Sequence, residues 1–296
     1  MPLALNGCLL CIVMNVIAEY KGRTLLIATK HRKEMVIAPL MEQTLGLNCI
    51  VAEEPDTDLF GTFTGETARR DPPQVTVRNK CLAAMEAHGC DLGLASEGSF
   101  GPHPSLFFVP ADDELLIFID KKKNLEIMAR EISTDTNFNG IDTSDEVELE
   151  DFARRARFPS HSLILRKSKT ENLDIIKGIN SWKELKNGFY LLKNKYGKVY
   201  AETDMRAMCN PTRMLVIRSA AEKLMKKICS ACPSCQLPGF DVTEVVSGLP
   251  CERCGFPTCS TLLHRFTCQH CFHVQELRFP NNKQVENPAF CDWCNP

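Results

Sequence analysis

Eight cysteines toward the carboxyl terminus carry the clearest chemical pattern in this chain. Two cysteines separated by two residues flank a tight turn that directs both sulfurs at one cation. Two such pairs complete the tetrahedral sulfur set that zinc accepts. The chain has four of these pairs, at Cys232/Cys235, Cys251/Cys254, Cys268/Cys271 and Cys291/Cys294. Eight ligands therefore predict two structural zinc ions.

The sequence leaves open which pairs share an ion. Residues 236–250, 255–267 and 272–290 separate successive pairs, and each spacer has about the length of a short hairpin. Neighbouring pairs could share an ion in series, or the first could join the third and the second the fourth in a cross-brace. Five further side chains are spare candidates that we do not expect to be ligands: Cys229, Cys259, His264, His270 and His273.

The placement of the cysteines also bears on the cellular compartment. None of the 16 lies between Cys90 and Cys209, so they do not form a disulfide framework spread over the chain. Thiolates kept for a metal ion require reducing conditions, and we expect a cytoplasmic location. A disulfide interpretation would require export, and an iron–sulfur cluster fits the four evenly spread pairs less well than zinc does.

Three polar clusters in the first third of the chain lie at predicted strand ends, where α/β proteins place their chemistry. Thr29-Lys-His-Arg-Lys-Glu34 combines a hydroxyl and basic side chains with the start of a predicted helix, which suits a phosphate. Gly61-Thr-Phe-Thr-Gly-Glu66 is followed by two arginines. In Ser96-Glu-Gly-Ser-Phe-Gly-Pro-His-Pro104, glycines and prolines are expected to fix a shaped loop around Glu97.

Together the clusters predict a Mg²⁺–phosphate site in a hydrolase of a nucleotide or another phosphate compound. Glu97 would hold the metal ion or activate water, with Thr29 and Lys80 as its catalytic neighbours. Phosphate-binding roles are expected of Lys33, Arg78 and Ser96. Each cluster alone is also consistent with an ordinary turn or a solvated helix face.

The elements that must position these residues alternate between strands and helices. Strand patterns occupy residues 24–29, 48–52, 92–96, 106–109, 115–120 and 162–165. Helical patterns occupy residues 34–45, 72–88 and 149–157, and residues 125–132 fit either type. The alternation predicts an α/β fold, a layered mixed sheet flanked by helices.

The same patterns predict three regions: an α/β domain at residues 14–170, a helical connecting segment at 171–228 and a two-zinc ribbon module at 229–296. In the connecting segment, a capping box at Ser181-x-x-Glu184 opens one helix and Asn210 caps another. Two strings in this segment have more specific polar residues than a simple connecting segment needs. They are Glu202-Thr-Asp-Met-Arg206 and Asn210-Pro-Thr-Arg213.

The first residues and one acidic segment resemble motifs that we do not expect to function. Residues 3–17 are largely apolar, but no basic residue precedes Lys21 and the run is too short to span a bilayer. We expect Met14 to be the start of the protein. Residues 135–146 match the calcium-loop pattern of an EF-hand, yet Asp142 stands at the usually apolar eighth position and no second loop exists. We expect no calcium binding.

Charge limits the classes of partner. The net charge is −2, and the basic residues of the cysteine-rich tail are scattered, so neither nucleic acid nor a membrane surface is supported as a partner. A small phosphate-containing ligand is the expected partner of the α/β domain. The tail suits stabilisation or docking to a protein, and a non-catalytic zinc-ribbon adaptor is the alternative function.

Several strings resemble an uncharacterised bacterial family, a domain of unknown function that covers nearly the whole length. They are Leu92-Gly-Leu-Ala-Ser-Glu-Gly-Ser-Phe-Gly-Pro-His-Pro104, Gly61-Thr-Phe-Thr-Gly-Glu66, Glu202-Thr-Asp-Met-Arg206 and Cys291-Asp-Trp-Cys294-Asn-Pro.

Residues 24–120 have a more distant resemblance to the inosine/xanthosine triphosphatases, which hydrolyse non-canonical purine nucleotides. The resemblance implies that Thr29 and Lys33 meet phosphate, that Asn79 and Lys80 face the phosphates, and that Glu97 binds Mg²⁺. His31 stands where that family has an asparagine, and Pro102-His-Pro104 replaces its usual continuation.

Overall fold

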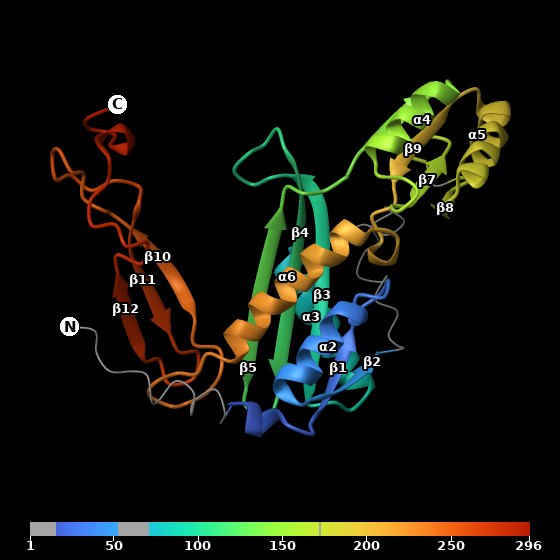
Figure 1. The fold of residues 1–296 in the computed structure, drawn as a ribbon. Helices are drawn as coiled ribbons and strands as arrows, with labels where there is room; N and C mark the ends of the chain where they lie inside the picture. Colours follow the sequence, from blue (N-terminus) through green and yellow to red (C-terminus); the bar gives the residue numbers. More distant parts are fainter. Residues whose placement is uncertain (1–15, 53–70, 172) are drawn as a thin grey trace. The chain divides into compact units, whose positions relative to one another are not determined.

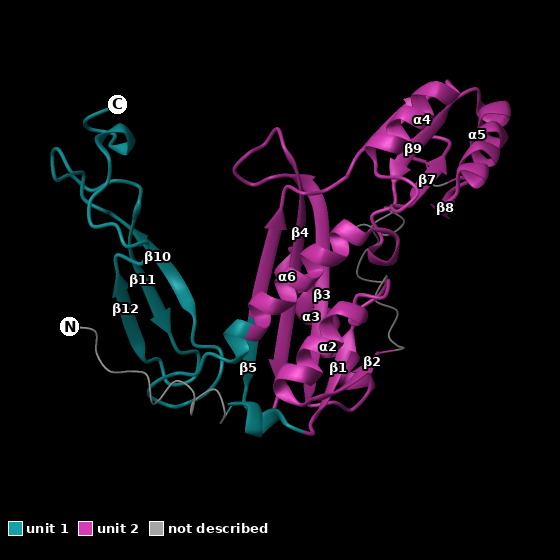
Figure 2. Cartoon of the chain, viewed as in Figure 1, with its two compact units in different colours: residues 1–21, 123–127, 226–296 teal, residues 22–122, 128–225 magenta. Residues whose placement is uncertain are grey.

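The computed structural model describes residues 16–52, 71–171 and 173–296. Contacts divide the chain into two compact units (Figure 2). One consists of Met1–Lys21, Lys123–Ile127 and Lys226–Pro296, and the other of Gly22–Lys122 and Met128–Met225. The expected division into residues 14–170, 171–228 and 229–296 stays a prediction.

The larger unit is built around a five-stranded mixed sheet, in the order β2-β1-β3-β4-β5. Strand β1 is parallel to β2 and β3, whereas β3 and β4 are antiparallel. This sheet and its helices confirm the predicted α/β class. Its strands are β1 (Thr24–Ala28), β2 (Asn48–Val51), β3 (Leu92–Pro102), β4 (Pro110–Asp120) and β5 (Leu125–Ser133).

Helices cover both faces of this sheet (Figure 1). Helix α3 (Pro73–Ala87) lies on one face, and α2 (Glu34–Leu45) and α6 (Pro211–Ile228) lie on the other. Because side chains alternate along a strand, odd-numbered residues of β3 and β4 face α3. The core on that side consists of Leu26, Ala28, Val77, Cys81, Ala84, Met85, Ala95, Leu115, Ile117 and Ile119.

The larger unit also contains a separate four-stranded antiparallel sheet in the order β6-β9-β7-β8. Helices α4 and α5 pack against it around buried Phe152, Phe189 and Leu163. Its elements are β6 (Gly140–Thr143), α4 (Glu146–Arg155), β7 (Leu163–Arg166), β8 (Ile176–Ile179), α5 (Trp182–Tyr196) and β9 (Val199–Thr203). The stretch 171–228, expected to be helical, therefore also supplies two strands, β8 and β9.

Several helices begin or end at the capping residues that the sequence predicted. The Ser181 hydroxyl accepts a hydrogen bond from the Glu184 amide and caps α5. The Asn210 side chain accepts from the Arg213 amide at 3.0 Å at the start of α6. Helix α2 ends at Gly46, whose φ of 65° lies in the left-handed region that glycine enters without strain. These caps satisfy backbone groups that a helix leaves unpaired.

Two expectations about the segment around Glu97 were wrong. The string that begins at Ser96 is not a loop: β3 continues to Pro102 because β4 pairs with it along its whole length, with Glu97 opposite Leu115. Residues 106–109 are not a strand. They belong to the turn between β3 and β4, where the His103 ring accepts hydrogen bonds from the Ser105 and Leu106 amides. Residues 125–132, which fitted either type, lie in β5.

The smaller unit carries a three-stranded antiparallel sheet, β10-β11-β12. Its strands are β10 (Val242–Ser247), β11 (Thr261–Thr267) and β12 (Val274–Arg278). Single turns of 3₁₀ helix occur at Pro288–Phe290 in this unit and at Ala207–Cys209 in the larger one. None of the helices in the described ranges is long and apolar enough to cross a membrane.

The segment that matches the calcium-loop pattern is divided between β6 and the start of α4. Its acidic side chains have basic partners: Asp135 pairs with Arg157 at 2.7 Å, and Glu146 with Lys186 at 2.8 Å. Coordination of Ca²⁺ needs these carboxylates to turn toward one centre. The existing ion pairs oppose such a rearrangement.

We therefore predict that this segment does not bind calcium with useful affinity. Adding micromolar Ca²⁺ should leave the melting temperature of the protein unchanged in differential scanning calorimetry. A rise of several degrees, abolished by Glu146→Gln, would show that the segment is a calcium site.

Candidate functional site

The eight paired cysteines converge as two four-ligand groups. In each group the sulfur atoms all lie within 4.8 Å of one another. The first pair joins the third and the second joins the fourth, which is the cross-brace arrangement and not two sites in series. We call them group 1 (Cys232, Cys235, Cys268 and Cys271) and group 2 (Cys251, Cys254, Cys291 and Cys294).

The spacing of the sulfurs fits one tetrahedral ion in each group. In group 1 the Cys232–Cys271 and Cys235–Cys268 sulfurs are both 3.6 Å apart. In group 2 the corresponding distances are 3.9 Å and 3.6 Å. A tetrahedral ion with metal–sulfur bonds of about 2.3 Å separates its ligands by about 3.8 Å. A disulfide would bring two sulfurs to about 2 Å. These two sites could therefore hold metal ions.

The same backbone turn presents each cysteine pair. The amide four residues after the first cysteine donates to its carbonyl: Gln236 to Cys232 at 2.9 Å, Gly255 to Cys251 at 2.9 Å, Phe272 to Cys268 at 3.2 Å and Asn295 to Cys291 at 2.8 Å. Gly255 has a φ of 72°, and Gln236 and Phe272 also adopt positive φ. From the sequence alone, only Gly255 indicated this turn.

In each group one thiol ionises more readily than another. In group 2 the Cys254 amide lowers the pKa of the Cys251 thiol to about 7, while the hydrogen bond that the Cys294 thiol donates to the Cys254 sulfur raises the pKa of Cys294 to about 12. In group 1 the His273 amide lowers the pKa of Cys271 to about 7, and burial raises that of Cys235 to about 12. Like charges this close disfavour one another, and a divalent ion removes the conflict.

The cross-brace makes a prediction about pairs of substitutions. Cys251→Ser combined with Cys291→Ser removes two ligands from one group, so the protein should keep one metal ion per chain. Cys232→Ser combined with Cys251→Ser damages both groups and should leave none. Native mass spectrometry of freshly purified protein measures the number of ions.

The exposed Cys259 belongs to neither group, so Cys259→Ser is the control and should retain both ions. Loss of both ions from the Cys251/Cys291 variant, with one retained by the Cys232/Cys251 variant, would contradict the pairing.

A second candidate site lies where β1 ends, beside the middle of the longer strand β3. Ala28 is paired with Ala95, so Thr29 follows β1 beside Ser96 of β3. Lys80, from α3, reaches this place from one side of the sheet. Its ammonium lies 3.7 Å from a Glu97 carboxylate oxygen and donates to the Ser96 carbonyl at 3.1 Å. Both charged side chains are buried.

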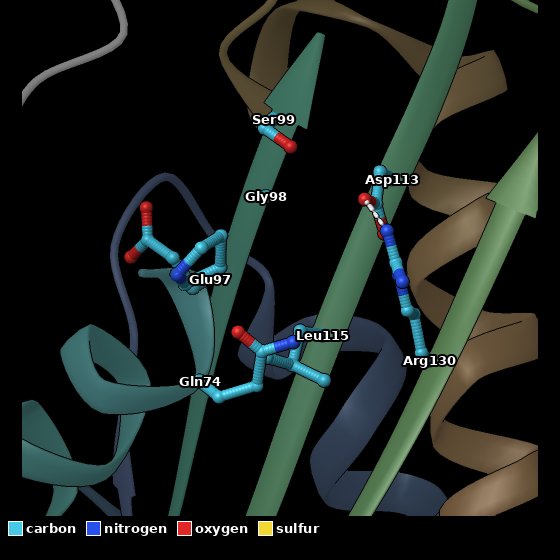
Figure 3. A pocket seen from close by; sticks show the side chains of 8 residues that line it. Gln74, Glu97, Gly98, Ser99, Asp113, Leu115 and Arg130 are labelled. Carbon is cyan, nitrogen blue, oxygen red and sulfur yellow. Dashed lines mark hydrogen bonds and ion pairs between the residues drawn. The ribbon is translucent and has the colours of Figure 1, made fainter. Parts of the chain in front are cut away.

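Glu97 also lines a small hollow on the α3 face of the sheet (Figure 3). The view shows Glu97 and Ser99 on β3, with Asp113 and Leu115 on β4. Arg130 of β5 donates to Asp113 at 2.7 Å. Gln74, from the first turn of α3, closes one side. Glu97 lies at one edge of the hollow, with its carboxylate directed away from Asp113 and Arg130.

On the other face, Lys33 and Arg213 share one buried carboxylate. The Lys33 ammonium donates to Glu114 Oε2 at 3.1 Å, and Arg213 Nε donates to Glu114 Oε1 at 2.7 Å. Burial lowers the pKa of Lys33 to about 8, although Glu114 opposes the shift. Burial likewise disfavours ionised Glu114, but Arg213 and Lys33 outweigh it and lower its pKa.

Three polar atoms near this pair have no hydrogen-bond partner within the described ranges: the hydroxyls of Thr29 and Ser96, and one oxygen of Asp112. All three residues are buried. Burial, reinforced by Glu114, raises the pKa of Asp112 to about 8. Buried polar atoms are usually satisfied by protein or by ordered water, so these atoms mark a place that water or a ligand can complete.

Five of the predicted site residues lie near one another: Lys80 and Glu97 on the α3 face of the sheet, Lys33 on the other face but within electrostatic reach of both, and Thr29 and Ser96 where β1 ends. We call these five residues, with Glu114 and Arg213, the charge cluster. The predicted phosphate-binding residues Arg78 and Asn79 are instead exposed on α3, and the string from Gly61 to Glu66 lies outside the described residues.

Sequence reasoning missed Glu114 and Arg213. The string that ends in Arg213 was noted only as unusually specific, and the acidic run Asp112-Asp-Glu114 directly before an apolar stretch was an unused signal.

Comparison with known proteins adds one match. A family model described as a domain of unknown function (DUF6671) matches residues 80–296, well over half of the chain. The matched range contains all eight cysteines of groups 1 and 2. Of the charge cluster it contains Lys80, Glu97, Glu114 and Arg213, but not Thr29 or Lys33. No curated protein matches the chain.

Proposed function

The chain belongs to the DUF6671 family of unknown function, and we propose that its charge cluster binds and hydrolyses a phosphate-containing compound with the help of Mg²⁺. One observation carries the proposal. Residues far apart in the sequence, Lys33, Lys80 and Glu97, gather beyond the carboxyl end of β1, together with a Thr29 hydroxyl that has no hydrogen-bond partner in the described part of the chain. Ligand sites of open α/β sheets occur at this edge.

The residues of the cluster suit complementary roles. The ammonium groups of Lys33 and Lys80 would attract the phosphate oxygens, and the Thr29 hydroxyl would donate to one of them. Glu97 fits as a Mg²⁺ ligand because it is a carboxylate that lines a hollow, and Mg²⁺ binds proteins through one or two carboxylates, water and the phosphates themselves. When bound, Mg²⁺ would offset phosphate charge and favour attack by water.

We further propose that zinc occupies both cysteine groups and that its role is structural. Four sulfur ligands leave no open position for a substrate or water, as in structural zinc sites. Because metal binding supplies folding free energy locally, its removal should unfold the smaller unit and leave the larger sheet intact. Elemental analysis of the purified protein identifies the metal. Thiolate ligation also favours a reducing compartment, and we propose the cytoplasm.

A phosphate-release screen over nucleotides and other phosphate esters with Mg²⁺ tests the hydrolase. Glu97→Gln should abolish Mg²⁺-dependent release with little change in melting temperature, because glutamine keeps the shape but loses the charge. Lys80→Ala should mainly raise KM, by roughly tenfold, since it removes an interaction with bound phosphate.

Lys183→Ala removes a positive charge from an exposed position on α5 and serves as the control. Its KM and kcat should equal those of the wild type. Mg²⁺-dependent release that persists in Glu97→Gln at the wild-type rate would rule out the assigned role of Glu97, and no release from any compound would rule out the hydrolase.

A second candidate function, docking of a partner protein, is favoured by exposed aromatic residues beside group 2. The rings of Phe256 and Trp293 stack at 5.2 Å between centroids, with 51% and 72% of each residue exposed, and Phe290 is 67% exposed. Aromatic side chains are enriched at protein interfaces. Acidic residues outnumber basic ones across residues 229–296, which favours a protein over nucleic acid.

Combined Phe256→Ser and Trp293→Ser substitutions test this docking surface. The variant should keep two metal ions and the wild-type melting temperature, but should lose the proteins that wild-type chain binds in chemical cross-linking. Phe107→Ser, at an exposed aromatic position in the larger unit, is the matched control. Identical cross-linked partners for the variant and the wild type would exclude this surface.

A further inference from the structure

We propose that Arg213 is a positioning residue of the phosphate site, which offsets the charge of Glu114 and so keeps Lys33 available to an incoming phosphate. The inference rests on the proposed function of the charge cluster. It assigns a role to a residue that does not itself contact the ligand, and it links helix α6 to the turn that follows β1.

The first support is the sharing of one carboxylate by two cations. Glu114 places one oxygen 3.1 Å from the Lys33 ammonium and the other 2.7 Å from Arg213 Nε. The Glu114 and Arg213 side chains are fully buried, and that of Lys33 is 4% exposed. Buried charges interact strongly because little water screens them. The charge on Arg213 therefore acts directly on how tightly Glu114 holds Lys33.

The second support is that the surroundings fix the Arg213 guanidinium. It donates to the Met205 carbonyl and stacks over the Phe100 ring, 5.0 Å from its centroid. Gly98 leaves the space that the ion pair occupies, since a Cβ at that position would lie 2.6 Å from Arg213 Nη2. Strand β3 and the segment that follows β9 thus hold Arg213 against Glu114.

Arg213 places one unit of positive charge beside Glu114. Without Arg213, the whole negative charge of Glu114 would act on Lys33, and the cluster would attract an anion less strongly. Removing the Glu114 charge as well would cancel that change. A purely structural role for Arg213 predicts instead that Glu114→Gln alone binds the anion more weakly, because that variant breaks the same buried network although it removes the negative charge.

The test measures binding of inorganic pyrophosphate, without metal, by isothermal titration calorimetry. Arg213→Met should weaken binding by about tenfold, the effect of one lost buried-charge interaction. Arg213→Met combined with Glu114→Gln should restore affinity to within about threefold of the wild type. Arg213→Lys, which keeps the charge, should retain most of the affinity. Melting temperatures identify variants that are not folded.

Each outcome decides the proposal. Wild-type affinity in Arg213→Met, or a double variant as weak as Arg213→Met, would overturn it while leaving the proposed function standing. If Arg213→Met does not fold, Glu114→Gln decides, since it should bind pyrophosphate at least as tightly as the wild type and a clear loss of affinity would refute the inference. A wild-type protein that does not bind pyrophosphate would remove the proposed function and this inference together.

Discussion

A carboxylate with no access to water must be surrounded by positive charge or hydrogen-bond donors, because its desolvation otherwise costs several kcal/mol. Glu114 meets this requirement with Lys33 from the start of α2 and Arg213 from the first turn of α6. The three residues come from distant parts of the chain, so their pairing constrains how both helices lie on the sheet. The arrangement around Thr29, Ser96 and Glu97 follows from that constraint.

The smaller unit has a very small apolar core. Strands β10 and β12 bury none of their residues, and β11 buries only Leu263. The apolar cluster around group 1 consists mainly of its cysteines with Phe240 and Phe266. So small an apolar core cannot by itself offset the conformational entropy of ordering the chain. Metal ligation would supply the missing free energy, which would account for ligands at four places in so short a segment.

The sequence predicts best what is decided locally. The cysteine pairs, the Ser181 cap and the end of α2 at Gly46 each depend on a few adjacent residues, and each was predicted. Glu97 was expected in a loop because glycines flank it, yet pairing with β4 keeps it in a strand. The ion pair between Glu114 and Arg213 joins residues 99 positions apart. Side-chain types alone do not indicate such a contact, since it exists only after two helices and the sheet have packed.

The cross-brace interleaves the two cysteine groups along the chain. Group 2 begins inside the segment that group 1 closes, and group 1 ends inside the segment that group 2 closes. The first ion to bind therefore shortens the free path between the ligands of the other, so part of the loop-closure entropy for the second ion has already been lost. Metal uptake should be positively cooperative, and under zinc scarcity a population of chains should divide into fully loaded and empty molecules.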